Sequence, residues 1–119
     1  ASVMADLLEA VVCEGTGSRA QVPGLSVAGK TGTGYKIQDN GTYQSDTGSR
    51  AYFATFVGFV PAYDPAVTIL VSIDEPDPSS RDRFGGTAAA PVFAKLAEMA
   101  IHERSIEPAV GDVGCAFEP

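Results

Sequence analysis

Two apolar segments, 51–60 and 66–74, are joined by only five residues, Pro61-Ala62-Tyr63-Asp64-Pro65. Both segments are rich in Val, Ile, Phe, Tyr and Thr, which favour extended backbone, whereas the proline and aspartate between them favour turns. Neither segment is long enough to span a bilayer as a helix. The spacing therefore predicts two antiparallel strands connected by a hairpin turn.

Helical periodicity marks both ends of the chain. Residues 2–14 carry apolar side chains at helical spacing, and Gly15 and Gly17 follow them as helix-terminating residues. Residues 88–103 show the same spacing, and Pro91 is tolerable there only in the first turn. The side chains expected to face the core are Val3, Leu7, Leu8, Val11 and Val12 in the first helix, and Val92, Phe93, Leu96, Met99 and Ala100 in the second.

A third strand is predicted over residues 25–31, where small and apolar residues alternate after Pro23-Gly24. Two polar segments, 34–50 and 75–86, lack an apolar period and are expected to form loops or, in the first case, a ragged hairpin. The order favours an α+β fold class: an antiparallel three-stranded meander flanked by an N-terminal and a C-terminal helix that cover one face together. Residues 1–103 are expected to form this unit, and residues 104–119 a C-terminal tail.

The net charge of −7 and the isoelectric point near 4.4 exclude several classes of partner. Nucleic acids and anionic membrane surfaces both favour basic faces, so we expect no nucleic acid partner and no membrane contact from this segment. The first residue is not methionine, no signal peptide is present, and the sequence opens directly on the amphipathic stretch. These features suggest a fragment or a processed chain.

Two cysteines, Cys13 and Cys115, lie near opposite ends of the sequence. The sequence contains no Cys-x-x-Cys pair and no Cys/His cluster, so we expect no metal site, and we expect no cofactor. A Cys13–Cys115 disulfide would pin the tail to the first helix and would suit a compartment outside the cytoplasm. Two unrelated thiols are equally compatible with the sequence.

The segment Gly24-Leu25-Ser26-Val27-Ala28-Gly29-Lys30-Thr31 matches the pattern GxxxxGK[ST] of nucleotide-binding P-loops. The apolar run 69–74, which ends in Asp74, could pass for the strand that carries a metal-holding aspartate. A P-loop, however, needs a buried strand before its first glycine and a helix after its lysine. Here polar residues and Pro23 precede Gly24, and a glycine-rich segment that cannot form a helix follows Thr31. The nucleotide-binding hypothesis is therefore the least favoured.

A second interpretation takes residues 26–33 as an edge strand. At a period of two, Lys30 and Gly32 point to one side, and Thr31 and Thr33 point to the other. A cationic lysine, two hydroxyls and a glycine without a side chain suit the binding of a carboxylate or an oxyanion. For these four letters alone, an exposed Lys-Thr turn with a flexible glycine loop would be the default explanation.

Further segments in a fixed order favour the binding strand. They are Val27-Ala28-Gly29-Lys30-Thr31-Gly32-Thr33, Phe56-Val57-Gly58-Phe59-Val60-Pro61, Ser72-Ile73-Asp74-Glu75-Pro76, Phe84-Gly85-Gly86-Thr87 and Ala89-Ala90-Pro91-Val92-Phe93, preceded by Val11-Val12-Cys13-Glu14-Gly15-Thr16-Gly17. In this order, residues 1–103 resemble the C-terminal portion of the transpeptidase domain of class B penicillin-binding proteins, the division- and elongation-type peptidoglycan D,D-transpeptidases. D,D-carboxypeptidases and serine β-lactamases share this fold, but segments 56–61 and 85–91 favour the transpeptidases.

The resemblance implies a partial penicillin-binding/serine β-lactamase-like domain that handles peptidoglycan stem peptides through an acyl-serine intermediate, which β-lactams also form. The family uses Ser-x-x-Lys for the nucleophile and its base, Ser-x-Asn for proton transfer, and Lys-Thr-Gly. Only the last is present here: no serine has a lysine three positions later, and Gln38 stands where a serine would precede Asn40. The nucleophile would then lie in an upstream part of the same domain, and this chain alone should be inactive.

The resemblance also implies roles for four residues of the predicted strand. Lys30 would supply positive potential, and the Thr33 amide would complete the oxyanion hole. Thr31 and Thr33 would hold the carboxylate of the substrate or of a β-lactam, and Gly32 would admit the substrate backbone.

The loop before the last helix would complete the site. Phe84 would form an apolar wall, although anchoring the loop to the core would explain it equally well, and Gly85 and Gly86 would let the loop pack closely. The expected partners are a stem peptide or β-lactam and the upstream part of the domain. The expected location is the extracytoplasmic face of the bacterial membrane, with an anchor upstream. A catalytically inactive scaffold or binding module of the same fold is the alternative.

Overall fold

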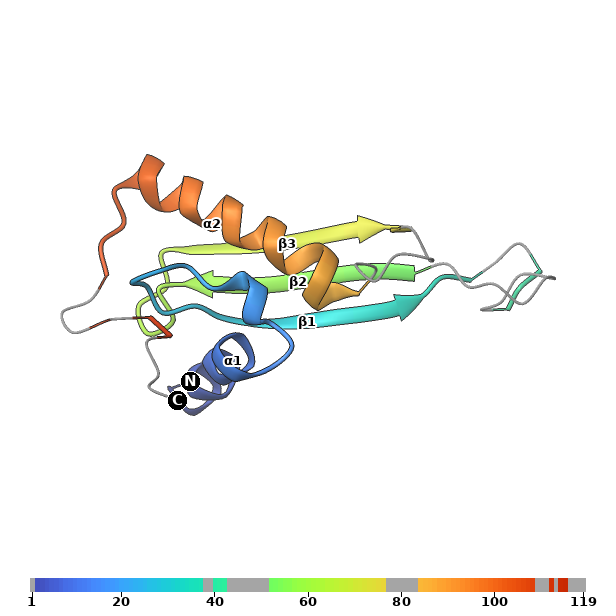
Figure 1. Cartoon of the computed structure of the whole chain (residues 1–119), viewed down its shortest axis with the longest axis horizontal. Coiled ribbons are helices and arrows are strands. Elements are labelled where there is room, and N and C mark those ends of the chain that lie inside the picture. Colours follow the sequence, from blue (N-terminus) through green and yellow to red (C-terminus); the bar gives the residue numbers. More distant parts are fainter. Residues whose placement is uncertain are drawn as a thin grey trace.

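The computed structural model describes residues 2–37, 40–42, 52–76, 84–108, 112, 114 and 115. Helix α1 (Ser2–Glu14) and a 3-10 turn, η1 (Ser18–Ala20), precede the strands β1 (Ala28–Tyr35), β2 (Tyr52–Val60) and β3 (Val67–Asp74). A π-helical turn, η2 (Gly85–Ala89), leads directly into α2 (Ala90–Arg104) (Figure 1). The predicted α+β fold, a three-stranded antiparallel meander with a helix at each end, is confirmed.

The described strands form one sheet in the order β1-β2-β3, and both neighbouring pairs are antiparallel. Val60 pairs with Val67 at the β2–β3 hairpin, where the Ala66 amide donates to the Val60 carbonyl at 2.9 Å. Lys30 pairs with Val57 of β2. The segment with the Lys-Thr-Gly motif therefore lies on an edge strand of the described sheet, as predicted.

The boundaries of β1 differ from the prediction at both ends. The strand begins at Ala28 rather than at Leu25, because a tight turn with Gly24 at φ +77° bonds the Leu25 amide to the Val22 carbonyl at 3.2 Å. At the other end β1 continues through Tyr35, which pairs with Tyr52. Pairing with β2 overrides the weak strand propensity of the glycine-rich sequence. Most of the predicted polar loops lies outside the described residues.

The core lies between the sheet and α2, which crosses one sheet face (Figure 1). Phe56 of β2 and Phe93 of α2 are fully buried, with their ring centroids 4.7 Å apart. Val12 of α1 and Val27, just before β1, are also fully buried in this cluster. The first turn of α2 accommodates Pro91, as expected.

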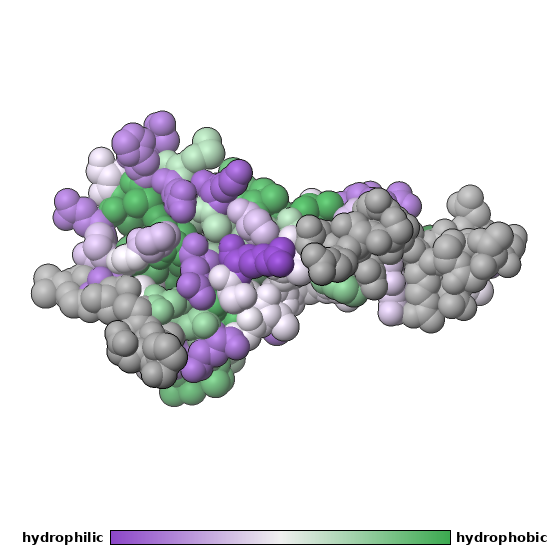
Figure 2. Space-filling view, in the orientation of Figure 1, coloured by the Kyte–Doolittle hydropathy of each residue, from purple (hydrophilic) through white to green (hydrophobic). Residues whose placement is uncertain are grey.

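The predicted core face of α1 is wrong in part. Val3 and Leu7 are 71 % and 58 % exposed, and the buried residues of the helix are Ala5 and Val12. The reason is that α1 lies beside β1 rather than over the sheet (Figure 1). The two helices therefore do not cover one face together. An apolar surface remains over α1 at the lower edge of the molecule (Figure 2).

The predicted core face of α2 also needs correction. Phe93 is buried as expected, but it shares the inward stripe with the small residues Ala90 and Ala97. The predicted core residues Val92, Leu96 and Met99 are exposed. Small side chains let a helix approach a sheet closely. The face of α2 that packs on the sheet is therefore the one with alanines, not the one with the most hydrophobic side chains.

Around Val57 and Leu70, the described residues leave the sheet face opposite α2 uncovered. Side chains alternate along a strand, so Val57 points away from α2 when Phe56 points toward it. Lys30, Val57 and Leu70 form a row across the three strands on this opposite face. Val57 is 43 % and Leu70 67 % exposed. None of the described helices is long and apolar enough to cross a membrane.

Candidate substrate-binding site

A cavity of about 440 Å³ lies where the end of α1, β1 and η2 meet. Its lining residues contribute five hydroxyl groups and one guanidinium group. The lining residues are Gly15, Thr16, Ser18, Arg19, Thr31, Thr33, Phe84, Gly86 and Thr87. Three segments far apart in the sequence thus form one surface, and it includes Thr31, Thr33, Phe84 and Gly86 of the residues predicted from the sequence.

Thr31 and Thr33 present their hydroxyls on the α2 side of β1. The Oγ1 atom of Thr31 lies 2.8 Å from the Oγ1 atom of Thr16, and either hydroxyl can be the donor. The Gly85 amide donates to Thr33 Oγ1 at 2.9 Å. The Gly85 amide occupies one acceptor lone pair of Thr33 Oγ1. The hydroxyl hydrogen of Thr33 is therefore available to donate to another acceptor. Both threonines are therefore oriented by neighbouring segments.

Lys30 and Gly32 lie on the other side of β1 and do not line the cavity. Lys30 is exposed, and its Nζ donates to the Thr31 carbonyl at 3.1 Å. Gly32 faces Thr55, whose Oγ1 donates to the Gly32 carbonyl at 3.3 Å. A Cβ at Gly32 would lie 2.5 Å from that Oγ1 atom. The alternation of these residues about the strand thus follows the predicted period of two.

Gly85 and Gly86 allow η2 to pack directly on the other two segments. A Cβ at Gly85 would lie 2.5 Å from both the Gly32 and Thr55 carbonyl oxygens. A Cβ at Gly86 would lie 2.3 Å from the Thr16 carbonyl oxygen. Real Cβ atoms almost never approach other atoms this closely, so both positions require glycine for the observed packing.

Phe84 forms the apolar part of the cavity. Its ring meets Tyr52 edge-on with the centroids 5.9 Å apart, and 39 % of the residue is exposed. The Phe84 amide donates to Thr87 Oγ1 at 3.2 Å, and the Ala88 amide donates to the Phe84 carbonyl at 2.7 Å. Phe84 therefore both anchors its segment and presents ring surface to the cavity.

Sequence reasoning missed five lining residues: Gly15, Thr16, Ser18, Arg19 and Thr87. Thr16 is positioned by its glycine neighbours, because the Gly15 and Gly17 amides both donate to the Val11 carbonyl at 3.0 Å and end α1 there. Thr16 lies in the segment 11–17 that contributes to the family resemblance, but the sequence assigned it no role in a site. Nothing in the sequence showed that this turn lies against Thr31.

The structure is incompatible with the P-loop hypothesis. Lys30 and Thr31 lie inside β1, not at the helix N-terminus that phosphate binding requires. Asp74 at the end of β3 forms an ion pair with Lys36. The Lys36 Nζ atom lies 2.6 Å from Asp74 Oδ1 and 3.3 Å from Glu75 Oε2. The hydrogen bond to Asp74 raises the pKa of Lys36. Among the described residues, no group of His, Cys, Asp and Glu could hold a metal ion.

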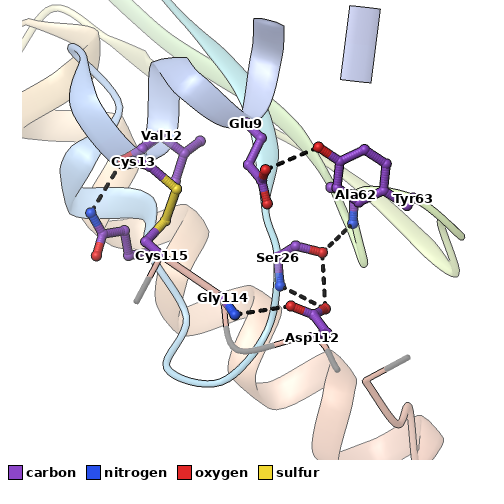
Figure 3. Close-up of a disulfide and its surroundings, with 10 residues drawn as sticks. Glu9, Val12, Cys13, Ser26, Ala62, Tyr63, Asp112, Gly114 and Cys115 are labelled. Carbon is purple, nitrogen blue, oxygen red and sulfur yellow. Dashed lines mark hydrogen bonds between the residues drawn. A yellow bond between two sulfur atoms is a disulfide. The ribbon is translucent and has the colours of Figure 1, made fainter. Parts of the chain in front are cut away.

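The C-terminal tail returns to the start of β1 (Figure 3). A disulfide joins Cys13 of α1 to Cys115, and Asp112 Oδ2 accepts from the Ser26 amide at 3.0 Å and from the Ser26 hydroxyl at 2.9 Å. Burial raises the pKa of Asp112, but hydrogen bonds from Ser26 and from the Gly114 amide outweigh burial and hold this pKa below its usual value. Part of the expected tail is therefore fixed to the domain.

Residues 1–98 match the protein family described as the penicillin binding protein transpeptidase domain. The chain belongs to this family. Stage V sporulation protein D of Bacillus subtilis (strain 168) is 40 % identical over 101 residues, which cover 85 % of this chain and 15 % of that protein. The probable peptidoglycan D,D-transpeptidase PenA of Neisseria meningitidis serogroup B (strain MC58) is 38 % identical over 94 residues, which cover 79 % of this chain and 15 % of that protein.

Solved transpeptidase structures share the fold. The transpeptidase domain of penicillin-binding protein 3 from Burkholderia pseudomallei matches with a TM-score of 0.71 and 36 % identity over 87 % of this chain and 30 % of that one. Penicillin-binding protein 3 from Mycobacterium tuberculosis, complexed with ampicillin, matches with a TM-score of 0.70 and 30 % identity over 97 % of this chain and 27 % of that one. The resemblance predicted from the sequence is confirmed, and the chain corresponds to part of a transpeptidase domain.

Proposed function

We propose that this chain supplies the substrate-binding strand of a peptidoglycan transpeptidase that cross-links stem peptides through an acyl-serine intermediate. The nucleophilic serine and its base would come from an upstream part of the same domain. The observation that carries this proposal is the convergence of Thr16, Thr31 and Thr33 with Phe84 around one cavity on the edge strand. The similarity to an ampicillin-complexed relative supports it.

The cavity suits a peptide or β-lactam carboxylate. Hydroxyls of Thr31 and Thr33 can donate to carboxylate oxygens, and Arg19 lines the same cavity with a positive charge. Phe84 offers an apolar wall to a methyl group or a drug side chain. Because β1 is an edge strand in the described sheet, alternate backbone N–H groups along it are not used by β2. We assign the oxyanion contact to the Thr33 amide from the resemblance of the Lys30–Thr33 segment to the family's motif.

Lys30 acts in this proposal from the other side of β1. It shares the uncovered sheet face with Val57 and Leu70, whose exposed apolar area a further part of the domain would bury. A nucleophile carried by that part could then lie close to the Lys30 ammonium. Positive potential there favours a developing anion, which explains why a lysine that does not line the cavity still contributes to acyl transfer.

The proposed location is the extracytoplasmic face of the bacterial membrane. The Cys13–Cys115 disulfide fits this location, because disulfides persist outside the reducing cytoplasm. The proposed partners are a stem peptide or β-lactam and the upstream part of the domain.

Labelling with a fluorescent penicillin tests the proposal. The longer protein, which contains this chain together with the upstream part of the domain, should form a covalent adduct with the penicillin. The isolated chain should not. Lys30→Ala in the longer protein should lower the second-order acylation rate constant by about 100-fold or more, the size typical of a lost electrostatic catalyst. Lys95→Ala is the matched control, because Lys95 is an exposed lysine of α2 away from the cavity. A longer protein that folds but does not label would instead indicate an inactive scaffold of the same fold.

A further inference from the structure

The C-terminal tail connects the two segments that meet at the cavity. Cys115 is bonded to Cys13 in the last turn of α1, which ends just before Thr16. Asp112 is bonded to Ser26, which lies just before β1 and therefore before Thr31 on the same chain segment. The two attachments hold the end of α1 and the start of β1 to a single short piece of chain (Figure 3).

The contacts of the tail are numerous for so short a segment. Asp112 Oδ1 accepts from the Gly114 amide at 2.9 Å, while its other oxygen takes both Ser26 bonds. Ser26 is 4 % exposed, and its Oγ also accepts from the Ala62 amide at 3.1 Å. Gly114 has φ +68°, and a Cβ there would lie 3.0 Å from the Leu25 amide nitrogen and carbonyl oxygen. The tail backbone therefore packs directly on the chain that leads into β1.

We propose that this tail is a redox-sensitive clasp that positions Thr16 against Thr31, so that reducing the Cys13–Cys115 disulfide slows acylation at the cavity. The inference rests on the proposed function for its kinetic readout. Asp112 and the two cysteines are positioning residues in it, because they act on the cavity through α1 and β1. The Thr16–Thr31 hydroxyl contact of 2.8 Å spans the two held segments. A small displacement of α1 relative to β1 is therefore enough to break it.

Reduction proceeds by thiol–disulfide exchange with a dithiol. A thiolate of the dithiol attacks one protein sulfur, a mixed disulfide forms, and the other protein sulfur leaves as a thiolate. The second sulfur of the dithiol then displaces the remaining protein thiolate. The dithiol ends as a cyclic disulfide, and Cys13 and Cys115 end as two thiols.

The test uses the longer protein and two readouts. The first is hydrogen exchange of the amides of residues 28–35, and the second is the second-order rate constant of acylation by a fluorescent penicillin. Four samples are compared with the wild type: the wild type treated with dithiothreitol, Cys13→Ser/Cys115→Ser, Asp112→Asn, and the triple variant. Glu107→Gln is the control, since it removes an exposed carboxylate elsewhere in the tail. Dithiothreitol should leave the double cysteine variant unchanged.

The clasp predicts faster exchange in β1 and acylation slowed by about threefold to thirtyfold in every tail sample except the control, below the ~100-fold that a 1 Å misplacement can cost. The triple variant should be acylated no more slowly than the slower of Cys13→Ser/Cys115→Ser and Asp112→Asn, because both attachments act through one tail. Additive effects, or unchanged β1 exchange and acylation after reduction, would overturn the clasp. Asp112→Asn keeps the disulfide and so guards against a variant that fails to fold. If the wild type is not acylated, the proposed function fails and hydrogen exchange alone decides the clasp.

Discussion

Replacing Gly86 by alanine should damage the cavity more than the fold. A Cβ there would lie 2.3 Å from the Thr16 carbonyl oxygen, whereas real Cβ atoms essentially never approach within 3.0 Å. The η2 turn and the Thr16 segment must therefore separate by at least about 0.7 Å, away from the geometry in which Thr16 reaches Thr31. Overpacking of this kind costs ~1–3 kcal/mol, and the lower backbone entropy of alanine in the unfolded chain offsets ~0.4–1 kcal/mol of it.

The expected outcome is a net loss of about 1–2 kcal/mol in the free energy of unfolding. The acylation rate constant should fall by about 10- to 100-fold, because reacting groups displaced by close to 1 Å lose that much. Thermal unfolding and fluorescent-penicillin labelling of the longer protein measure the two effects. Gly34→Ala is the matched control, since a Cβ at Gly34 meets nothing within 4 Å. An acylation rate constant of Gly86→Ala within twofold of that of Gly34→Ala would contradict this expectation.

Three further predictions concern the tail and the uncovered sheet face. Removing the disulfide, which closes a loop of 102 residues, should cost up to ~4.7 kcal/mol by the chain-entropy estimate; an unfolding temperature that reductant leaves unchanged would contradict this. Hydrogen bonding depresses the folded-state pKa of Asp112. The Asp112 carboxylate therefore contributes its full stabilisation above the unfolded pKa near 3.8, and this stabilisation is lost as the pH falls through the folded-state pKa. The stability difference between the wild type and Asp112→Asn in urea titrations should therefore shrink below about pH 4, and a constant difference down to pH 2 would count against the bond. The isolated chain should self-associate through the face that carries Val57 and Leu70, and threonine at both positions should reduce its sedimentation coefficient; a monomeric wild-type chain would argue against an unburied face.

The sheet could be predicted from local sequence because its signals are local. β-branched and aromatic residues define β2 and β3, and the prolines between them define the hairpin. The start of β1 could not be predicted in this way. Gly24 and Leu25 form a turn, but the alternation of small and apolar residues after them is also typical of a strand. Pairing with Tyr52 extends the other end, and that pairing is a property of β2 rather than of the glycine-rich segment itself.

The helix faces show why periodicity alone is insufficient. Val3 and Leu7 follow a helical period, yet they are exposed because the described sheet contacts another side of α1. In α2, Leu96 and Met99 are exposed while Ala97 is buried, since packing closeness rather than hydrophobicity selects the inward stripe. A period predicts that a helix has a face, but the neighbouring elements determine which face is buried.

Only the cavity residues that lie in a recognised motif could be predicted from the sequence. The positions of Thr31 and Thr33 follow from strand alternation, and Gly86 follows from the resemblance of its segment to the family. Thr16 could not be placed, because its contact with Thr31 depends on how α1 ends beside β1. The Asp112–Ser26 contact joins residues separated by 86 positions and leaves no local trace in the sequence.

The selectivity of acylation for a free carboxylate tests whether Thr31 and Thr33 hold the substrate. The acylation rate constants of the longer protein with a penicillin and with its methyl ester should differ strongly in the wild type. Thr31→Val/Thr33→Val should reduce this ratio by at least about tenfold, the equivalent of one or two charge-assisted hydrogen bonds, while Thr68→Val on the other sheet face should leave it unchanged. A ratio that stays constant when both hydroxyls are removed would show that Thr31 and Thr33 do not hold the substrate carboxylate.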